Sequence, residues 1–363
     1  MIGSVLGPAG SYSEIAARTL FATVCDGKTP ELLLCPSLES AVMRLFEADA
    51  DGQKSDFALV PIENSVEGAV GVSMDLLLEK DVSIVAEMIL PVSHCLLVSE
   101  NAAKDPDFSI DKIDIVFSHP QGLYQCRSFL QAHLKNAELI EVDSTSKAAQ
   151  RVSELSEICF ESNRGIESEI NSESESEIDS ESESEIDSES ESEIRFKNGS
   201  ADSVIYAAIA SENAGREYGL KTVCSGIQDH VNNSTRFLIL VRSEVIPLLK
   251  AYASDTEFSI LPEFLSQTGS GSVFYKTSVV VSPKQDKPGA LFHILEAFYN
   301  YDINLTRIES RPSKKSLGEY QFYIDFEGSP SDSNVSGALL AVKGRSARLK
   351  ILGTYGRILP SRQ

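Results

Sequence analysis

The chain has 363 residues, 42% of them hydrophobic, which predicts two or three globular domains with ample apolar cores. Its formal net charge of −22 at pH 7 argues against nucleic acid as a partner, because such binding needs basic stripes that displace counterions. No segment approaches the roughly 18 consecutive apolar residues of a membrane-spanning helix, and MIGSVLGPAGSYSE lacks the basic region and long apolar stretch of a secretory leader. We therefore expect a cytoplasmic protein with no membrane partner.

The first two-thirds of the chain alternates short apolar runs with amphipathic segments. Six runs are predicted strands: 2–6, 57–62, 83–90, 94–98, 114–118 and 137–142. Farther along the chain, we predict a helix over 203–219 and a strand over 234–241. Strands separated by helical segments are typical of an α/β fold.

Residues 161–195 form an acidic insert of low complexity. The insert holds 14 acidic and 2 basic residues, and it repeats SESESEID from residues 172 and 180 and SESESEIR from residue 188. One isoleucine in eight residues buries too little apolar area to offset chain entropy, so we expect disorder or a solvated helix. An acidic binding tail is the alternative, but a tolerated surface loop is the interpretation we favour.

Residues 243–274, which contain QTGSGS, are predicted to be a linker with some helix of its own. The pattern then restarts as strand 277–282, helix 289–302, strand 304–312, strand 320–328, helix 336–344 and strand 348–356. This order is a βαββαβ module of the ferredoxin-like kind, contained in residues 275–363. The module has no obvious catalytic constellation, and such modules are often regulatory or oligomerising.

Four predicted strand-to-helix turns are rich in hydroxyl, amide and glycine residues: GPAGSYSE (7–14), PIENSVEG (61–68), SHPQG (118–122) and STSKAAQ (144–150). Each turn alone fits a well-made helix cap, since Ser, Asn and Gly are favoured there for structural reasons. In an open α/β sheet, however, such turns line one crevice and point helix N-terminal amides at it. Four together favour a site for a small anion with more than one carboxylate, with Lys147 and Arg236 as nearby cations.

Signatures of other chemistries are missing from the sequence. The cysteines and histidines are dispersed without metal-ligand spacing, so we expect no metal. No Walker loop, dinucleotide fingerprint or Ser-His-Asp order supports phosphoryl transfer, redox chemistry or acyl transfer. Hydroxyl and amide donors around an anion instead suit an enzyme whose substrate is predisposed to react without a cofactor. Thr235 and Arg236 stand where a polar cluster meets a strand, although an ordinary strand residue and a solvated charge would explain them too.

Seven motifs, in order, resemble those of the prephenate dehydratase family: GPAGSYSE, VPIENSVEGAV, SHCLLV, FSHPQGLYQC, STSKAA, AAIASENAGREYGL and NNSTRF. They span nearly all of residues 1–242 apart from the acidic insert. PGALFHILEAF and IESRP resemble the GAL and ESRP motifs of ACT domains. The resemblance implies a phenylalanine-regulated, monofunctional enzyme, since no helical chorismate mutase segment precedes Ile2. It also implies a catalytic domain with two α/β lobes of the type II periplasmic-binding-protein kind and substrate in their cleft.

The resemblance also implies roles for individual residues. Thr235 is the implied key catalytic donor, Arg236 is implied to position a substrate carboxylate, and Phe237 to wall the pocket. The implied substrate-binding residues are Glu63, Asn64, Ser65, Ser118, His119, Gln121, Ser144 and Thr145. The implied effector site of a homodimer or homotetramer combines Gly289, Ala290 and Leu291 of one chain with Glu309, Ser310, Arg311 and Pro312 of another.

The implied reaction removes a ring hydroxyl and a carboxylate from prephenate and gives phenylpyruvate, on the way to L-phenylalanine. Formation of the aromatic ring drives this reaction, so no metal or cofactor is required. Thr235 would donate a hydrogen bond or relay a proton as the C–O bond breaks. L-phenylalanine is the implied allosteric inhibitor, with its carboxylate at the amides after Gly289 and its ring against apolar side chains.

The sequence departs from the family pattern in three places. Gly122 stands where the family usually has alanine, the ending LGTYGRILP is longer than usual, and the linker 243–274 is longer than expected. Three alternatives stay open: arogenate dehydratase, which differs in an amino group on the substrate side chain; a noncatalytic amino-acid sensor with a binding-protein-like cleft; and an interaction protein organised by the acidic repeat. Thr235, Arg236 and the PIENS residues disfavour the sensor, and only the insert supports the third.

Overall fold

The computed structural model describes residues 1–24, 31–48, 52–170, 204–246, 275–285, 287–314 and 318–358. The chain divides into two compact units. The first unit comprises Met1–Gly7, Tyr12–Pro91 and Asn232–Gln363, and the second comprises Pro8–Ser11 and Val92–Val231. Most of the predicted linker, residues 247–274, lies outside the described residues.

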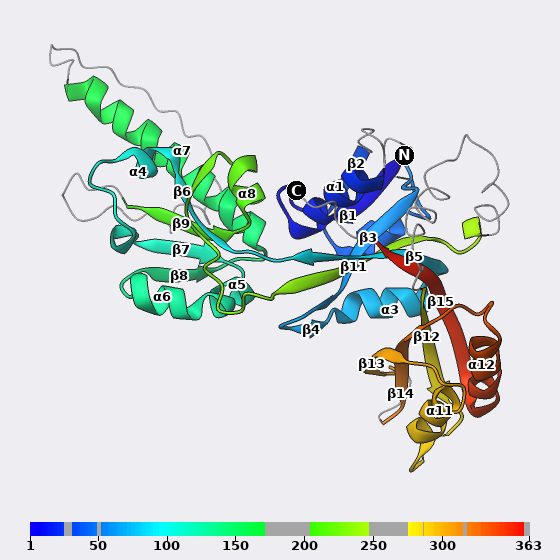
Figure 1. Ribbon diagram of the computed structural model, residues 1–363. Helices are drawn as coiled ribbons and strands as arrows, with labels where there is room; N and C mark the ends of the chain where they lie inside the picture. Colours follow the sequence, from blue (N-terminus) through cyan, green and yellow to red (C-terminus); the bar gives the residue numbers. More distant parts are fainter. Residues whose placement is uncertain are drawn as a thin grey trace. The chain divides into compact units, whose positions relative to one another are not determined.

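The first unit is built on a ten-stranded sheet (Figure 1). One part of this sheet has the order β5-β11-β3-β1-β2, with β4 beside β3. Its strands are β1 (Ile2–Leu6), β2 (Glu31–Cys35), β3 (Phe57–Asn64), β4 (Gly68–Ala69), β5 (Val82–Pro91) and β11 (Ser234–Arg242). β1 runs parallel to β2 and β3, whereas β11 runs antiparallel to both of its neighbours. The helices of this part are α1 (Tyr12–Val24), α2 (Leu38–Met43) and α3 (Gly71–Glu79).

The other part of the sheet belongs to what we call the C-terminal module, residues 275–358. Its elements are β12 (Lys276–Pro283), α11 (Ala290–Tyr299), β13 (Leu305–Pro312), β14 (Tyr320–Glu327), α12 (Ser333–Arg345) and β15 (Ser346–Ile358). The predicted βαββαβ order is confirmed, and the strand order in the sheet is β13-β14-β12-β15. The C-terminal module therefore continues the sheet of the first unit without a break.

Strand β15 makes that continuity possible. Its first residues pair antiparallel with β12, and its last three, Gly356 to Ile358, pair in parallel with Ala86 to Met88 of β5. Gly353 lies where β15 meets β5, and a Cβ there would lie 2.2 Å from the backbone oxygen of Ile84. Only a residue without a side chain allows this close approach.

The second unit contains a five-stranded sheet of order β10-β6-β9-β7-β8 (Figure 1). Its strands are β6 (Cys95–Ser99), β7 (Ile115–Ser118), β8 (Glu138–Glu141), β9 (Tyr206–Ala210) and β10 (Leu220–Ser225). Its helices are α4 (Glu100–Lys104), η1 (Ile110–Lys112, a 3₁₀ turn), α5 (Pro120–Gln125), α6 (Arg127–His133), α7 (Thr145–Ile170) and α8 (Glu212–Glu217). The first ten residues of the acidic insert, 161–170, continue α7, and residues 171–195 lie outside the described part of the chain.

The α/β fold class is confirmed, and so are the six early strands, but the predicted helix over 203–219 was wrong. Tyr206–Ala210 forms strand β9, and only Glu212–Glu217 is helical. All five residues of β9 are buried, and the strand lies between β6 and β7 in the sheet. A run that is apolar at every position fits a central strand as well as a helix, so tertiary pairing decides between them.

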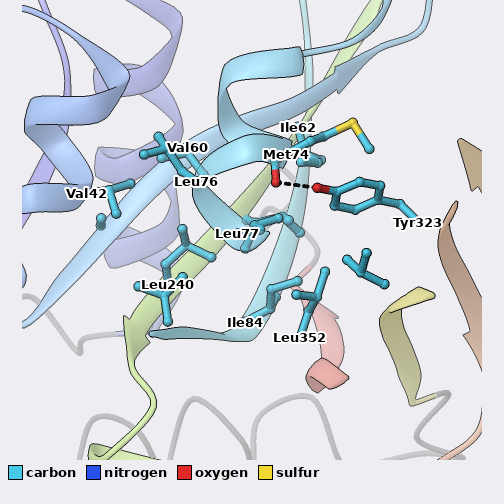
Figure 2. Packing of buried hydrophobic residues seen from close by; sticks show 14 of the residues in the cluster. Val42, Val60, Ile62, Met74, Leu76, Leu77, Ile84, Leu240, Tyr323 and Leu352 are labelled. Carbon is cyan, nitrogen blue, oxygen red and sulfur yellow. Dashed lines mark hydrogen bonds between the residues drawn. The ribbon is translucent and has the colours of Figure 1, made fainter. Parts of the chain in front are cut away.

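Apolar side chains cover both faces of the first-unit sheet. One face packs α1 against Phe57, Met88 and Phe237. On the other face, α2 and α3 pack together with side chains of the C-terminal module, as Figure 2 shows for Tyr323 and Leu352. The Tyr323 hydroxyl donates to the backbone oxygen of Met74 in α3 at 2.8 Å. Among the helices of the described ranges, none combines the length and the apolar content that a membrane crossing requires.

Candidate active site

Thr235, the candidate donor, lies half-buried at the start of β11, opposite Asn64 at the end of β3. The Asn64 amide nitrogen donates to the Thr235 hydroxyl oxygen at 3.0 Å and to the Asn233 side-chain oxygen at 2.9 Å. A threonine hydroxyl can accept two hydrogen bonds and donate one. An amide N–H can only donate, so the Thr235 oxygen is the acceptor in this contact and the hydroxyl proton is not used by it.

The turn that follows β3 is tied to the turn that precedes β11. The Asn64 side-chain oxygen accepts from the amides of Val66 and Glu67, which closes the first turn. Ser65 then exchanges hydrogen bonds with the backbone of the second turn: its amide donates to Ser234, its hydroxyl donates to Asn232, and the Ser234 amide donates back to the Ser65 hydroxyl. The structure thus brings Asn64, Ser65 and Thr235 together in one hydrogen-bonded cluster.

Arg236 points to the interior of the first unit and is only 9% exposed. Its Nε donates to Glu87 of β5 at 2.7 Å, its Nη1 to Asp325 of β14 at 2.6 Å, and its Nη2 to the Tyr355 hydroxyl of β15 at 2.9 Å. Every nitrogen of the guanidinium therefore already has a protein partner. This geometry favours a role in holding β11 over the direct contact with a substrate carboxylate that the family resemblance implies.

The Glu87 carboxylate accepts hydrogen bonds from three cations, although Glu87 is only 1% exposed. Besides Arg236, it accepts from Lys276 of β12 at 2.9 Å and from Arg357 of β15 at 2.9 Å. Burial acts to raise the pKa of Glu87, but the charges of Arg236 and Lys276 outweigh it and hold the pKa below its usual value. Burial together with the nearby charge of Arg236 lowers the pKa of Lys276, as expected where several cations share one carboxylate.

Two further predicted site residues, Glu63 and Phe237, are placed differently from Thr235 and Arg236. Glu63 is partly exposed, and its carboxylate lies 3.1 Å from Arg307 Nε of β13 and 3.7 Å from Arg236 Nη1. The contact with Arg307 is an ion pair without the alignment of a hydrogen bond. Phe237 was predicted to wall the pocket; its side chain points to the face of the sheet opposite that of Arg236 and lies within the apolar core that packs against α1.

In the second unit, the SHPQG and STSKAAQ turns meet at one edge of the five-stranded sheet. Ser118 ends β7, is fully buried, and donates its hydroxyl proton to the backbone oxygen of Ile209 at 2.8 Å. A Cβ on Gly122 would lie 2.4 Å from the Ser118 hydroxyl oxygen and 3.3 Å from the Thr145 methyl group. Glycine at 122 therefore leaves room for the Ser118 hydroxyl in this orientation, which gives a physical reason for its departure from alanine.

The remaining predicted residues of this unit lie at helix N-termini. His119 caps α5, and its Nδ1 accepts from the amide of Gln121 at 3.2 Å, which requires the proton on Nε2. The Ser144 hydroxyl accepts from the Lys147 amide at 3.0 Å at the start of α7. The Lys147 ammonium, named from the sequence as a cation near these turns, pairs with Asp143 at 2.7 Å on the surface.

The C-terminal module contains a cavity of about 960 Å³ at the start of α11. Gly289, Ala290 and Leu291 line it, together with residues of β12, β14 and the start of β15. Gly289 has the left-handed φ of 85° that permits the sharp entry into α11. The predicted effector residues Glu309, Ser310, Arg311 and Pro312 lie on β13 instead, where the Arg311 guanidinium pairs with Asp75 of α3 at 3.3 Å.

Sequence reasoning missed the buried partners of Arg236. A carboxylate with apolar neighbours on both sides was the available indication, since Glu87 stands between Ala86 and Met88 and Asp325 between Ile324 and Phe326. A carboxylate at such a position is rarely buried without a charged partner. Within the described ranges, no three His, Cys, Asp or Glu side chains are grouped so that they could hold a metal ion.

Comparison with known proteins identifies the family of this chain. The family model described as Prephenate dehydratase matches residues 4–178 and 175–245, and the model described as ACT domain matches residues 284–344. The fold and the two family matches define an α/β hydro-lyase that carries an ACT regulatory module. The chain belongs to the prephenate dehydratase family.

Individual relatives agree with this assignment. The chain is 32% identical over 349 residues to the prephenate dehydratase of Methanocaldococcus jannaschii, covering 96% of this chain and 95% of that protein. It is 31% identical over 354 residues to the bifunctional chorismate mutase/prephenate dehydratase of Aquifex aeolicus, covering 98% of this chain and 73% of that protein. Among solved structures, the prephenate dehydratase of Arthrobacter aurescens in complex with L-Phe has a TM-score of 0.66 at 25% identity, covering 100% of this chain and 92% of that one.

Proposed function

We propose that this chain converts prephenate into phenylpyruvate, with Thr235 as the hydroxyl that assists departure of the ring hydroxide. The hydrogen bond from Asn64 to Thr235 carries the proposal, because it occupies an acceptor site of the hydroxyl and leaves its proton to donate. A threonine hydroxyl is too weak an acid to ionise at neutral pH. It can nevertheless stabilise the negative charge that develops on a leaving oxygen.

The reaction asks little else of the protein. The C–O bond electrons leave with the hydroxide, which takes up one proton and departs as water. The electrons of the bond to the ring carboxylate move into the ring, and carbon dioxide departs. The aromatic product supplies the driving force, so positioning and hydrogen bonding suffice for rate enhancement. Two carboxylates on the substrate also fit a site bordered by amide and hydroxyl donors.

A direct assay tests this function. Purified protein is incubated with prephenate and, separately, with arogenate, and the formation of phenylpyruvate and phenylalanine is followed. We expect phenylpyruvate from prephenate, and a Thr235→Ala variant should lower turnover by roughly 10²- to 10⁴-fold, as for other positioned donors. Thr235→Ser should be milder, because it keeps the hydroxyl.

Two further variants sharpen the assay. Asn64→Asp keeps the oxygen that closes the turn but loses the amide donor to Thr235, so turnover should fall while the fold is retained. Ser83→Ala is the control, since it removes a hydroxyl that bonds to the Ser243 hydroxyl, far along β5 and β11 from Thr235. Near-normal turnover of Thr235→Ala would refute the role of Thr235, and product from arogenate alone would replace prephenate as the substrate.

We also propose that L-phenylalanine inhibits the enzyme by binding at the start of α11. Three observations support this: the ACT match over residues 284–344, the cavity lined by Gly289, Ala290 and Leu291, and the L-Phe complex of the Arthrobacter aurescens relative. The first amides of α11 suit the amino-acid carboxylate, and the leucine and phenylalanine side chains at 291 and 292 suit its ring. Residues 309–312 of a second chain would complete the site in a homodimer or homotetramer.

Calorimetry of L-phenylalanine binding tests this site. A Cβ at 289 has room, because the nearest atom is 3.8 Å away on His293, so the strain in Gly289→Val comes from the left-handed backbone. We expect this variant to lose phenylalanine binding, and Gly289→Asn, which tolerates left-handed φ better, to retain part of it. Light scattering with and without phenylalanine reports the oligomeric state. Undiminished binding to Gly289→Val, or no binding to the unmodified protein, would defeat the assignment.

A further inference from the structure

Arg236 belongs to a closed ring of hydrogen bonds, which the proposed mechanism does not use. The other members of the ring are Tyr355, Ser278 and Asp325. Arg236 donates to Tyr355 and to Asp325, and Ser278 of β12 links those two residues from the other side. Glu87 holds the remaining guanidinium nitrogen from β5. The ring therefore joins β11 to three strands of the C-terminal module.

The direction of each hydrogen bond in the ring is fixed by the number of protons available. A carboxylate only accepts, so the single hydroxyl proton of Ser278 goes to Asp325. The contact between Ser278 and Tyr355 must then use the Tyr355 proton. The Tyr355 hydroxyl therefore accepts from Arg236 and donates to Ser278. Without this hydroxyl, Arg236 would be linked to Ser278 only through Asp325.

The ring is closed off from water. Arg236, Glu87, Ser278, Asp325 and Tyr355 are all buried, and Tyr355 is among the largest fully buried side chains of the chain. At such a depth, solvent does not replace a partner that is removed, and the guanidinium has to move to find another. The position of the Arg236 side chain thus depends on residues of the C-terminal module.

This dependence bears on Thr235, which precedes Arg236 on β11. The pairing of β11 with β3 shifts register between Arg236 and Phe237, as at a β-bulge. The pairing of β11 with β5 is regular from Ser234 to Ile239, so the disturbance lies on the side of β3, the strand that carries Asn64. A bulge re-aims neighbouring side chains, and the anchored arginine adds a constraint one residue from the hydroxyl that faces Asn64.

We propose that Tyr355 and Asp325 of the C-terminal module act through Arg236 as positioning residues for Thr235. The module then does more than receive an effector, because it completes the placement of the candidate catalytic strand. A shift of β14 or β15 would reach Thr235 through a single side chain. This inference rests on the proposed function of Thr235.

Tyr355→Phe tests the proposal, and Tyr323→Phe is its matched control. Both tyrosines belong to the same apolar cluster and bring a buried hydroxyl from the C-terminal module to the rest of the first unit, but the Tyr323 hydroxyl bonds to Met74, whereas the Tyr355 hydroxyl bonds to Arg236. We expect Tyr355→Phe to lower kcat for prephenate by roughly 10- to 100-fold with KM little changed, since a small misplacement of a catalytic group costs that much. Tyr323→Phe should keep kcat.

Hydrogen exchange of backbone amides gives a readout that does not need activity. In Tyr355→Phe, the amides of residues 234–237 should exchange faster than in the unmodified protein, whereas in Tyr323→Phe they should not. Ser278→Ala provides a second variant if Tyr355→Phe does not fold, because it opens the ring without removing a partner of Arg236. It should give a smaller loss of kcat of the same kind.

The outcomes separate this inference from the proposed function. If Thr235→Ala is inactive while Tyr355→Phe and Tyr323→Phe have equal kcat, the positioning role is overturned and the dehydratase assignment stands. If Thr235→Ala retains normal turnover, the assignment of Thr235 falls, and exchange at residues 234–237 decides alone whether the ring holds β11. Unchanged exchange in both Tyr355→Phe and Ser278→Ala would overturn the inference.

Discussion

At the scale of single residues, the Glu87 carboxylate offsets the positive charge of cations in the interior of the first unit. It is ionised beside Arg236, Lys276 and Arg357, which come from β11, β12 and β15. Burial of an ion costs free energy, and only the surrounding cations offset that cost. Removal of this one charge would leave two buried cations, Arg236 and Lys276, with less compensation than they need.

Glu87→Gln should therefore lower the free energy of unfolding at pH 7 by about 3 kcal/mol, the order measured when a buried ion pair loses one partner. Because the folded pKa of Glu87 is lowered, its stabilisation is present above the unfolded pKa of about 4.3 and is lost as the pH falls through the folded value. The difference between the unmodified protein and the variant should shrink below that pH. Urea unfolding at pH 7, 5, 4 and 3 measures it.

Glu100→Gln is the control for this pH dependence. Glu100 is an exposed residue of α4 whose carboxylate pairs with Lys104 and Lys221 on the surface. Water screens such a pair, so this substitution should hardly change the unfolding curve at any of these pH values. A constant difference between Glu87→Gln and the unmodified protein from pH 7 to pH 3 would contradict the ionised state of Glu87.

At the scale of elements, β15 links the C-terminal module to the rest of the first unit. Lys350 of this strand also donates to the backbone oxygens of Leu77, Leu78 and Lys80, at the end of α3. Positive charge at a helix C-terminus is stabilising, so the strand supports α3 as well as the sheet. Gly353 is the point on which the approach of β15 to β5 depends.

Gly353→Ala should lower the melting temperature, because the new Cβ would meet the Ile84 backbone, which cannot rotate away. Overpacking of this kind costs roughly 1–3 kcal/mol. Gly344→Ala in α12 is the matched control, since no atom lies within 4 Å of a Cβ there and alanine favours a helix. Thermal unfolding of the two variants should give shifts of opposite sign, and equal shifts would contradict the close approach at Gly353.

At the scale of the whole molecule, charge is distributed unevenly along the chain. The insert 161–195 carries 14 acidic and 2 basic residues, so its net charge is 2 − 14 = −12, out of −22 for the entire chain. Its sequence offers almost no apolar side chains with which to pack. The family motifs and the candidate site residues all lie outside it.

Removal of residues 171–195 should therefore leave prephenate turnover and the melting temperature unchanged, since long surface insertions contribute little to stability. A Gly/Ser segment of equal length in the same place is the control that separates the effect of charge from the effect of length. Loss of soluble protein or of turnover in both variants would reveal a structural role for the repeat. Loss in the deletion alone would assign the role to length.

The sequence by itself determined most of the element types, because local periodicity and turn chemistry act over a few residues. It predicted the α/β class, the βαββαβ module and the helix that starts near Gly289, and through family resemblance it pointed to Asn64 and Thr235. It failed at 206–210, where a run of apolar residues is compatible with either a helix or a strand. Pairing with β6 and β7 decides that case, and pairing is a long-range property.

Only the tertiary structure decided what Arg236 contacts. Its partners Glu87, Asp325 and Tyr355 lie 149, 89 and 119 residues away in the sequence. A buried charge is stable only when its partners arrive from every side, and which distant strands bring them depends on the order of strands in the sheet. The motif that contains Thr235 and Arg236 therefore indicated that this stretch is important. Packing determined that Thr235 contacts Asn64, whereas Arg236 contacts Glu87, Asp325 and Tyr355.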